Sequence, residues 1–476
     1  MASEIRVNKI ENRSGLGTVT FADTGVNLAG IVTATTFSGS GASLTNVPDS
    51  ALSAVTASKL TGALPAISGA SLTGMASTEN VRTGILDVAG VSTFRNTMNV
   101  GAAVTISESG IEASGIGITC ASINGAQIGG RRNIIINGAM EVSQRGTSFS
   151  EVDNNDITLD RFGLIHPYSN HFDVSQSTDS PDGFSKSYKL DINTVDSSIG
   201  SGQYVVIRTK IEGQDLQQLA FGTSGAKPIT LSFYVRSNKT GTFAVNIQQS
   251  DNSSKQVSAP YTISSANTWE RKTFTFAGDT SGVINDDNGT GLTVIWWLSA
   301  GSTYNSGTSR STFTTHADAD AAVGCNVNIL DSTDNNFYLT GVQLEVGSQA
   351  TPFEHRSYQE EIQLCYRYYY KLQPGAGAYF GSGFWYSSNS FICHVDFPVV
   401  MRTNLTAVEQ SGTADHYKVI HNSTTSTCSS VPSYLGDANN TSQSLNFTFS
   451  GSGTQGQGGL GRSGNASAYF AWNAEL

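Results

Sequence analysis

The sequence predicts a mainly β fold: an elongated trimer with a repetitive N-terminal shaft, a jelly-roll or β-sandwich domain, a short helical connector and a small C-terminal β-sandwich tip. The first observation is a change of composition near residue 131. The chain has 22 Phe, 17 Tyr and 5 Trp, yet residues 1–130 contain only Phe21, Phe37 and Phe94. The second is a low charged fraction of 14% together with 50 glycines, which suits β-structure with many turns rather than disorder. Only the chain beyond residue 130 has enough large apolar side chains to bury a compact core.

Composition and charge argue against several classes of protein. The net charge of −11 disfavours a nucleic-acid binder, because phosphate contacts need clustered Lys and Arg. No apolar stretch approaches the roughly 18 residues of a membrane span, so no membrane insertion is expected. The N-terminus lacks the apolar region of a signal peptide. Five scattered cysteines are typical of neither a disulfide framework nor a zinc site, and synthesis in a reducing cytoplasm fits best.

Residues 31–130 are predicted to form the shaft. Residues 41–45 and 69–73 both read Gly-Ala-Ser-Leu-Thr. Each copy offers one or two aliphatic side chains followed by a turn residue, and one copy cannot bury them alone. Winding three chains about one axis would turn these sparse apolar residues into a continuous buried seam, which favours a homotrimer. The alternative is a flexible linker rich in Gly, Ser and Thr.

Residues 131–352 are expected to form the jelly roll, because apolar residues alternate with period two and no sustained helical stripe is present. Residues 229–248 read as two alternating segments around a turn, which predicts a hairpin. Alternation in a later strand places Trp296 and Trp297 on opposite faces. A change of phase at Gly341 predicts a β-bulge.

Residues 353–372 are expected to form a helical connector. Ser357 and Glu360 have the spacing of a capping box. One helix face would then carry Tyr358, Ile362, Cys365 and Tyr369. In a trimer, three such helices could meet on the axis; alternatively, the helix packs on its own domain.

Residues 373–476 again show short β-like segments and are expected to form the tip, a second and smaller sandwich. A Gly-rich stretch at 451–464 is predicted to be a loop between these strands.

Exposed aromatic residues are the candidate binding residues, since sugars stack their faces on aromatic rings flanked by polar groups. In the jelly roll the candidates are Trp297 and Tyr304. Ile295 shares a face with Trp297 and is also apolar, so burial of this face at a subunit interface is the alternative. In the tip, Gly and Ser interleave with the four candidates Tyr379, Phe384, Trp385 and Tyr386; the alternative for these is an ordinary sandwich core.

The sequence predicts no metal, no cofactor and no enzyme activity. Acidic clusters at 286–289, 316–320 and 331–336 offer oxygen ligands, but none matches an EF-hand loop. No G-x-S-x-G, H-E-x-x-H or P-loop motif is present. Sequence spacing cannot reveal a pair of carboxylates placed for glycan cleavage, so a polysaccharide-degrading activity remains the alternative.

Several motifs resemble proteins of bacteriophages. Residues 3–10 and 30–39 resemble structural proteins of marine cyanophages. Residues 133–140 (Asn-Ile-Ile-Ile-Asn-Gly-Ala-Met) resemble the start of the carbohydrate-binding-like jelly roll of phage tail fibres, as does Asp-Arg-Phe at 160–162. Residues 341–345, 350–354 and 365–369 resemble its end. The last four residues are similar to other fibre C-termini.

The resemblance implies a bacteriophage tail fibre protein, a homotrimer located in the tail of the virion. Residues 1–30 would attach it to phage tail or baseplate proteins through the attachment residues Ile5, Val7 and Ile10. Its C-terminal β-domains would recognise a host cell-surface polysaccharide. A purely structural virion connector is a further alternative.

Overall fold

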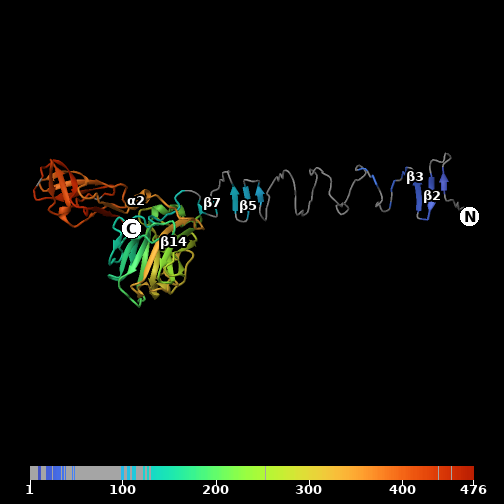
Figure 1. Ribbon diagram of the computed structural model, residues 1–476, viewed down its shortest axis with the longest axis horizontal. Helices are drawn as coiled ribbons and strands as arrows, with labels where there is room; N and C mark the ends of the chain where they lie inside the picture. Colours follow the sequence, from blue (N-terminus) through green and yellow to red (C-terminus); the bar gives the residue numbers. More distant parts are fainter. Residues whose placement is uncertain are drawn as a thin grey trace. The chain divides into compact units, whose positions relative to one another are not determined.

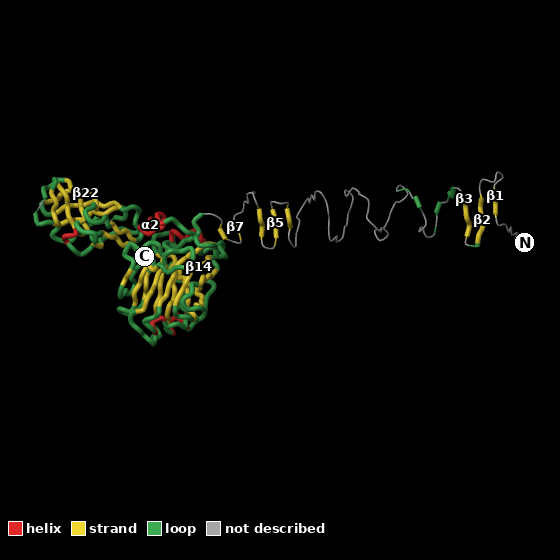
Figure 2. Tube along the Cα trace, viewed as in Figure 1, coloured by secondary structure: helices red, strands yellow, loops and turns green. Residues whose placement is uncertain are grey.

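The computed structural model describes residues 130–476 except 252, 253, 438 and 452, together with short stretches before residue 130. These stretches are residues 9–11, 18–23, 25–29, 31–33, 35, 36, 38, 45, 46, 48, 98–100, 104–107, 110–113, 122, 123, 126 and 127. The chain divides into two compact units, residues 1–99 with 106–110 and residues 100–105 with 111–476. Strands dominate the regular structure, and the helical segments are short (Figure 2).

The first unit contains a three-stranded antiparallel sheet of β1 (Lys9–Glu11), β2 (Thr18–Ala22) and β3 (Gly25–Ala29) (Figure 1). Ile10, a predicted attachment residue, pairs with Val19 of β2. Ile5 and Val7 lie outside the described residues.

Five short strands precede the jelly roll, in sheets of the order β4-β5-β6 and β7-β8. They are β4 (Met98–Val100), β5 (Val104–Ser107), β6 (Gly110–Ala113), β7 (Ser122–Ile123) and β8 (Ala126–Gln127). The repeats at 41–45 and 69–73 lie outside the described residues except for Thr45, so the trimeric shaft stays a prediction.

The jelly roll consists of two six-stranded sheets with antiparallel pairing. Sheet I has the order β10-β13-β18-β15-β16-β19, and sheet II has the order β17-β14-β20-β12-β11-β9. The strands of sheet I are β10 (Gly163–Ile165), β13 (Tyr204–Glu212), β15 (Gly241–Gln249), β16 (Lys255–Ile263), β18 (Thr290–Ala300) and β19 (Thr314–Thr315). Those of sheet II are β9 (Ser148–Phe149), β11 (Phe172–Ser177), β12 (Ser187–Ile192), β14 (Ile229–Ser237), β17 (Glu270–Phe276) and β20 (Asn336–Val346). Short helical turns lie between strands: η4 (Gly213–Leu219), α1 (Ser302–Asn305), η5 (Asp318–Asp320) and η6 (Ile329–Asp331).

The core of the jelly roll is built from the alternating apolar residues that the sequence indicates. Leu231 and Phe233 of β14 and Phe243 and Val245 of β15 are fully buried in one cluster. The predicted hairpin is nevertheless wrong, because β14 belongs to sheet II and β15 to sheet I. An arch across a sandwich and a hairpin bury the same alternate residues, so the pattern identifies the core face but not the partner strand.

The predicted bulge in β20 is confirmed. Pairing between β14 and β20 shifts by one residue between Ser232 and Tyr234, and Gly341 has a φ of 61°. A Cβ at this position would lie 2.8 Å from ring atoms of both Phe184 and Tyr234. Glycine therefore supplies both the left-handed backbone and the space that the two rings occupy.

The first and last residues of the jelly roll are hydrogen-bonded side by side. Asn133 Nδ2 donates to Val342 O at 3.0 Å, and Asn133 Oδ1 accepts from Leu344 N at 3.1 Å. The Asn133 main-chain N–H donates to Glu354 Oε2 at 2.6 Å. A Cβ on Gly138 would lie only 2.1 Å from Val342 O. We call this set of contacts the module seam; it joins the two groups of motif residues, at 133–140 and 341–354.

The capping box predicted for the connector helix is present. Ser357 Oγ accepts from Glu360 N at 3.3 Å, and Glu360 Oε2 accepts from Ser357 N at 3.1 Å, so α2 (Tyr358–Tyr366) begins there. The helix ends earlier than the predicted stripe, and Tyr369 opens β21 (Tyr369–Leu372) instead.

The tip is a second sandwich, with a seven-stranded sheet β26-β25-β29-β22-β23-β28-β27 and a three-stranded sheet β21-β30-β24. Its remaining elements are β22 (Tyr379–Ser387), β23 (Ser390–Asp396), β24 (Glu409–Gln410), η7 (Ala414–His416), β25 (Tyr417–His421), β26 (Thr424–Thr427), β27 (Ser433–Tyr434), β28 (Ser442–Thr448), β29 (Gly458–Ser463) and β30 (Phe470–Asn473).

The prediction of a loop at 451–464 is wrong over its last part, because β29 is a central strand of the tip. A Cβ on Gly461 would lie 3.0 Å from Cys393 Sγ, and one on Gly459 would lie 3.0 Å from Phe391 Cε2. Large core side chains thus fill the space that side chains on β29 would need. The composition is that of a loop, but the glycines serve close packing.

A pair of glycines on neighbouring strands tests this packing. Replacement of Gly383 with Ala would bring the new Cβ to 1.9 Å from Ile392 O, whereas Gly458 meets nothing closer than 3.9 Å. We expect Gly383→Ala to lower the free energy of unfolding by about 1–3 kcal/mol. Gly458→Ala should be neutral or slightly stabilising. Denaturant unfolding of both variants checks this, and equal effects would contradict the packing argument.

Candidate functional site

An aromatic pocket lies on the outer face of sheet I. Because side chains alternate along a strand, Trp296 of β18 faces the core and Trp297 faces outward, as predicted. Tyr204 and Arg208 of β13 line the same cavity. The cavity measures about 260 Å³. Its lining residues are Ile165, Tyr204, Val206, Arg208, Gln248, Ile295, Trp297, Tyr304, His316, Asp318 and Ala321.

The segment after β18 folds back over this face and supplies Tyr304 from α1. Gly301 N donates to Gln203 O at 2.8 Å, and Ala322 N donates to Tyr304 O at 2.8 Å. A Cβ on Gly301 would lie 2.1 Å from Gly200 O, so glycine is needed for this close approach. These contacts hold α1 against the sheet.

Three rings form one cluster in the pocket. The ring centroids of Tyr204 and Trp297 are 5.8 Å apart, those of Trp297 and Tyr304 are 5.2 Å apart, and those of Tyr204 and Tyr304 are 5.1 Å apart. These separations fall in the range of favourable aromatic pairs. Burial, together with Tyr204 and Asp318, raises the pKa of Tyr304, so its hydroxyl stays protonated at neutral pH. The cluster is therefore a neutral surface that can both stack and hydrogen-bond.

Polar groups surround the rings. The Arg208 guanidinium donates to Asn155 Oδ1. Gln248 Nε2 lies 3.3 Å from His316 Nε2, and the same His316 nitrogen lies 3.8 Å from Asp318 Oδ1. The pocket thus combines aromatic faces with a few convergent polar groups, the pattern typical of small-molecule sites.

The structure brings the two jelly-roll candidates together. Trp297 and Tyr304 line one pocket, but Trp297 is only 5% exposed and supports the other two rings. Its face is covered by the chain's own segment, including Ala321 and Cys325, rather than by a neighbouring subunit. Tyr204 was not predicted, although its alternation with buried Val205 could have placed it on the outer face.

The tip candidates separate into two groups. Tyr379, Phe384 and Tyr386 of β22 are exposed on the outer face of the seven-stranded sheet. Trp385 is fully buried against Phe391, with ring centroids 5.6 Å apart. The prediction of Trp385 as a receptor contact therefore needs correction, because alternation turns its ring into the core between two exposed neighbours.

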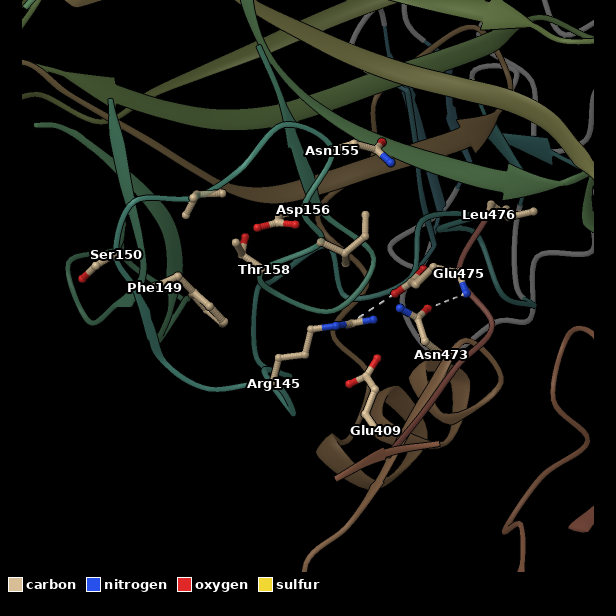
Figure 3. A pocket seen from close by; sticks show the side chains of 12 residues that line it. Arg145, Phe149, Ser150, Asn155, Asp156, Thr158, Glu409, Asn473, Glu475 and Leu476 are labelled. Atoms are coloured by element: carbon tan, nitrogen blue, oxygen red, sulfur yellow. Dashed lines mark hydrogen bonds and ion pairs between the residues drawn. The ribbon is translucent and has the colours of Figure 1, made fainter. Parts of the chain in front are cut away.

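A second and larger cavity, which we call the junction cleft, lies where residues of the jelly roll and of the tip meet (Figure 3). It measures about 570 Å³. Arg145 points into it and lies 3.5 Å from Glu475 Oε1, and its guanidinium stacks on the Tyr369 ring at 3.6 Å. Glu409 Oε2 accepts from the Tyr369 hydroxyl at 2.9 Å. The junction cleft is lined by Arg145, Phe149, Ser150, Val152, Asn155, Asp156, Ile157, Thr158, Glu409, Asn473, Glu475 and Leu476.

The last residues of the chain hold this junction together. Glu475 forms an ion pair with Arg161, which is buried and stacks on the Tyr368 ring at 3.4 Å. Arg402 Nη2 donates to Glu475 O at 2.9 Å, and Lys210 Nζ donates to Leu476 O at 2.9 Å. The charged groups of the junction are therefore engaged within the protein, which favours a structural role for them.

A further ion pair fixes the connector to the jelly roll. Arg367 Nε and Nη2 each donate to one carboxylate oxygen of Glu212, both at 2.7 Å, and the Glu212 side chain is fully buried. This is the two-pronged geometry in which an arginine binds a carboxylate most strongly.

The three acidic clusters are occupied by internal contacts. Asp320 accepts from Thr308 N at 2.7 Å and from Arg310 Nε at 2.8 Å, and these contacts lower the pKa of its carboxyl group. Asp331 pairs with Lys239, and Asp287 Oδ1 accepts from Gly289 N at 2.8 Å. Within the described stretches, no group of three His, Cys, Asp or Glu side chains is placed to hold a metal ion. No helix in that part of the chain is long and apolar enough to cross a membrane.

Comparisons with known proteins find similarity in solved structures alone: no protein-family model and no curated protein matches the chain. The enzymatically active domain of tailspike protein 4 from bacteriophage CBA120 is 13% identical with a TM-score of 0.25, over 45% of this chain and 21% of that chain. A family 11 carbohydrate-binding module from Clostridium thermocellum, in complex with a mixed-linked tetrasaccharide, is 11% identical with a TM-score of 0.22, over 44% and 99% of the two chains. The CBM22-1 xylan-binding domain from Paenibacillus barcinonensis is 10% identical with a TM-score of 0.21, over 43% and 94%. This chain therefore spans about a fifth of the tailspike structure, and such low scores carry no ligand or activity over to it.

Proposed function

We propose that this protein is a bacteriophage tail fibre that binds a host cell-surface polysaccharide without cleaving it. The observation that carries the proposal is the aromatic pocket, where Tyr204, Trp297 and Tyr304 converge beside Arg208 and Gln248. Sugar rings present apolar faces and hydroxyl groups, which such a mixture of rings and polar groups complements. A volume of about 260 Å³ lies just below the usual range for ligand pockets, so it suits a single sugar residue of a longer glycan.

The outer face of the tip offers a second contact surface for the same glycan. Phe384 pairs with Ile392 on β23, and Leu460 of β29 is exposed on the neighbouring strand. Phe384 and Tyr386 are 47% and 61% exposed. An exposed apolar patch of this kind is typical of an interaction site. Two weak surfaces on one chain would raise the overall affinity by avidity.

The N-terminal unit would supply trimerisation and attachment to the virion tail. Val26 and Leu28 of β3 are exposed in the single chain, as is Ile31 directly after it. Burial of these side chains between three chains would remove them from water. In this proposal, Ile5, Val7 and Ile10 contact the phage tail or baseplate.

The proposal is tested by measuring binding of the full chain to a microarray of bacterial envelope polysaccharides and then titrating the strongest ligand. Tyr304→Ala should weaken that affinity about tenfold, because the ligand loses a stacking face. Tyr358→Ala removes an equally large exposed ring from α2 and serves as the matched control. Absence of binding to any polysaccharide, or equal losses in both variants, would contradict the proposal, and release of reducing sugars would favour a degrading enzyme instead.

A further inference from the structure

Arg208 is a cation at the edge of the aromatic pocket without an acidic partner. Its guanidinium donates to the neutral Asn155 Oδ1, and none of the described carboxylates lies within ion-pair distance of it. Its place on β13, two residues after Val206, aims it outward with the pocket-lining side chains. Arginine is always charged at neutral pH, so this charge has to be balanced by solvent or by a ligand.

The surroundings of Arg208 carry an excess of positive charge. A small adjoining cavity is lined by Arg208, Arg161 and Lys210 together with Glu475 and Leu476, and Lys210 Nζ donates to Leu476 O at 2.9 Å, so Arg208 is the cation of this group that has no oxyanion partner among the described residues. Glu475 is already paired with Arg161 and lies 3.5 Å from Arg145. Burial, together with Arg208, Arg161 and Arg402, lowers the pKa of Lys210 to about 8. The local field therefore favours an anion beside Arg208.

The other charged groups of the pocket do not cancel this field. Asp318 has a side chain that is 61% exposed, and its carboxylate lies 3.8 Å from His316 Nε2. Water screens such an exposed charge effectively. Tyr304 adds no negative charge, because burial raises the pKa of its hydroxyl group.

We propose that the aromatic pocket binds a sugar residue bearing an anionic substituent, a carboxylate or a sulfate, and that Arg208 donates its hydrogen bonds to that group. The inference rests on the proposed glycan-binding function and names the class of glycan. Two parallel N–H groups match the spacing of carboxylate or sulfate oxygens, while the Tyr304 and Tyr204 rings contact the sugar. Asn155 orients the guanidinium through its side-chain oxygen.

Calorimetric titration of the full chain with matched probes tests this. The probes are an oligogalacturonate, the same oligosaccharide after carboxyl reduction, a sulfated galactan oligosaccharide and its desulfated form. The wild type should bind at least one anionic probe about tenfold more tightly than its neutral form. The preferred pair shows whether the group is a carboxylate or a sulfate.

Three variants separate the role of Arg208 from general electrostatics. Arg208→Met keeps the aliphatic stem and should lose about tenfold in affinity for the anionic probe, with under a twofold change for the neutral one. Arg208→Lys should retain part of the affinity. Arg131→Met removes the same charge from an exposed ion pair outside the pocket and should change neither.

Two results would overturn the inference while leaving the proposed function intact: equal binding of neutral and anionic probes by the wild type, or equal losses for both probes in Arg208→Met. Binding of no glycan of any kind, on these probes or on the polysaccharide array, would overturn both.

Discussion

Replacement of Trp385 with Ala should lower the free energy of unfolding of the tip by about 3–5 kcal/mol, the usual cost of removing a fully buried tryptophan. The ring packs against Phe391, His421 and Phe449, with centroid separations of 5.6, 4.9 and 4.7 Å. Its removal leaves a cavity among these three rings in the core of the tip. Denaturant unfolding followed by circular dichroism measures the loss.

The neighbouring residue provides a control for this prediction. Phe384→Ala removes a ring that is 47% exposed and should change stability by no more than about 0.5 kcal/mol. It should instead weaken adsorption to host cells if the outer tip face contacts the receptor. A large loss of stability in Phe384→Ala with none in Trp385→Ala would show that β22 has the opposite register.

Replacement of Glu475 with Gln should destabilise the junction between the two sandwiches by about 3–5 kcal/mol. The change leaves the Arg161 guanidinium, whose side chain is 3% exposed, without a counter-charge. Breaking a buried ion pair by removing one partner has a cost of this size, because the remaining charge stays desolvated. Limited proteolysis should cleave the junction faster than in the wild type, and unfolding should begin at a lower denaturant concentration.

Two further variants give this prediction its controls. In Arg161→Met/Glu475→Gln the more deeply buried of the two unpaired charges is absent and only Arg145 lacks its partner, so the double variant should be more stable than Glu475→Gln alone. Loss of the exposed Arg131–Glu360 pair, with side chains 56% and 49% exposed, should leave the free energy of unfolding essentially unchanged, because water screens both charges. If Glu475→Gln has an effect equally small, the pair with Arg161 is not stabilising the junction.

Local features of the fold could be predicted from the sequence because their causes lie within a few residues. The capping box at Ser357 and the bulge at Gly341 both follow from short-range chemistry. The partner of each strand could not be predicted, as the separation of β14 and β15 into two sheets shows. Strand β29 could not be predicted either. Its glycines are required because Phe391 and Cys393 of another strand fill the space beside them, and no pattern within β29 reveals this.

Of the candidate site, too, only the features that local sequence determines could be predicted. Alternation along β18 placed Trp297 on the outer face. The burial of Trp297 against Ala321 and Cys325 could not be predicted, because it depends on a loop that folds back over the sheet. The pair of Arg161 with Glu475 joins residues 314 positions apart, and no local pattern marks it. Alternation could have placed Tyr204 on an outer face, but only the pairing of β13 with β18 brings Tyr204 and Arg208 beside Trp297.

The module seam bears on how such a chain can change in evolution. Because Asn133 is hydrogen-bonded to Val342 and Glu354, the jelly roll enters and leaves the chain at one place, the arrangement that tolerates exchange of a whole domain by recombination. The junction opposes such an exchange, since Arg161 and Glu212 of the jelly roll pair with Glu475 and Arg367 beyond it. A foreign jelly roll lacking these two partners would leave Arg367 of the connector and Glu475 of the tip without their counter-charges. Recombination that preserves these ion pairs therefore has to exchange both sandwiches together, residues 131–476, rather than one sandwich alone.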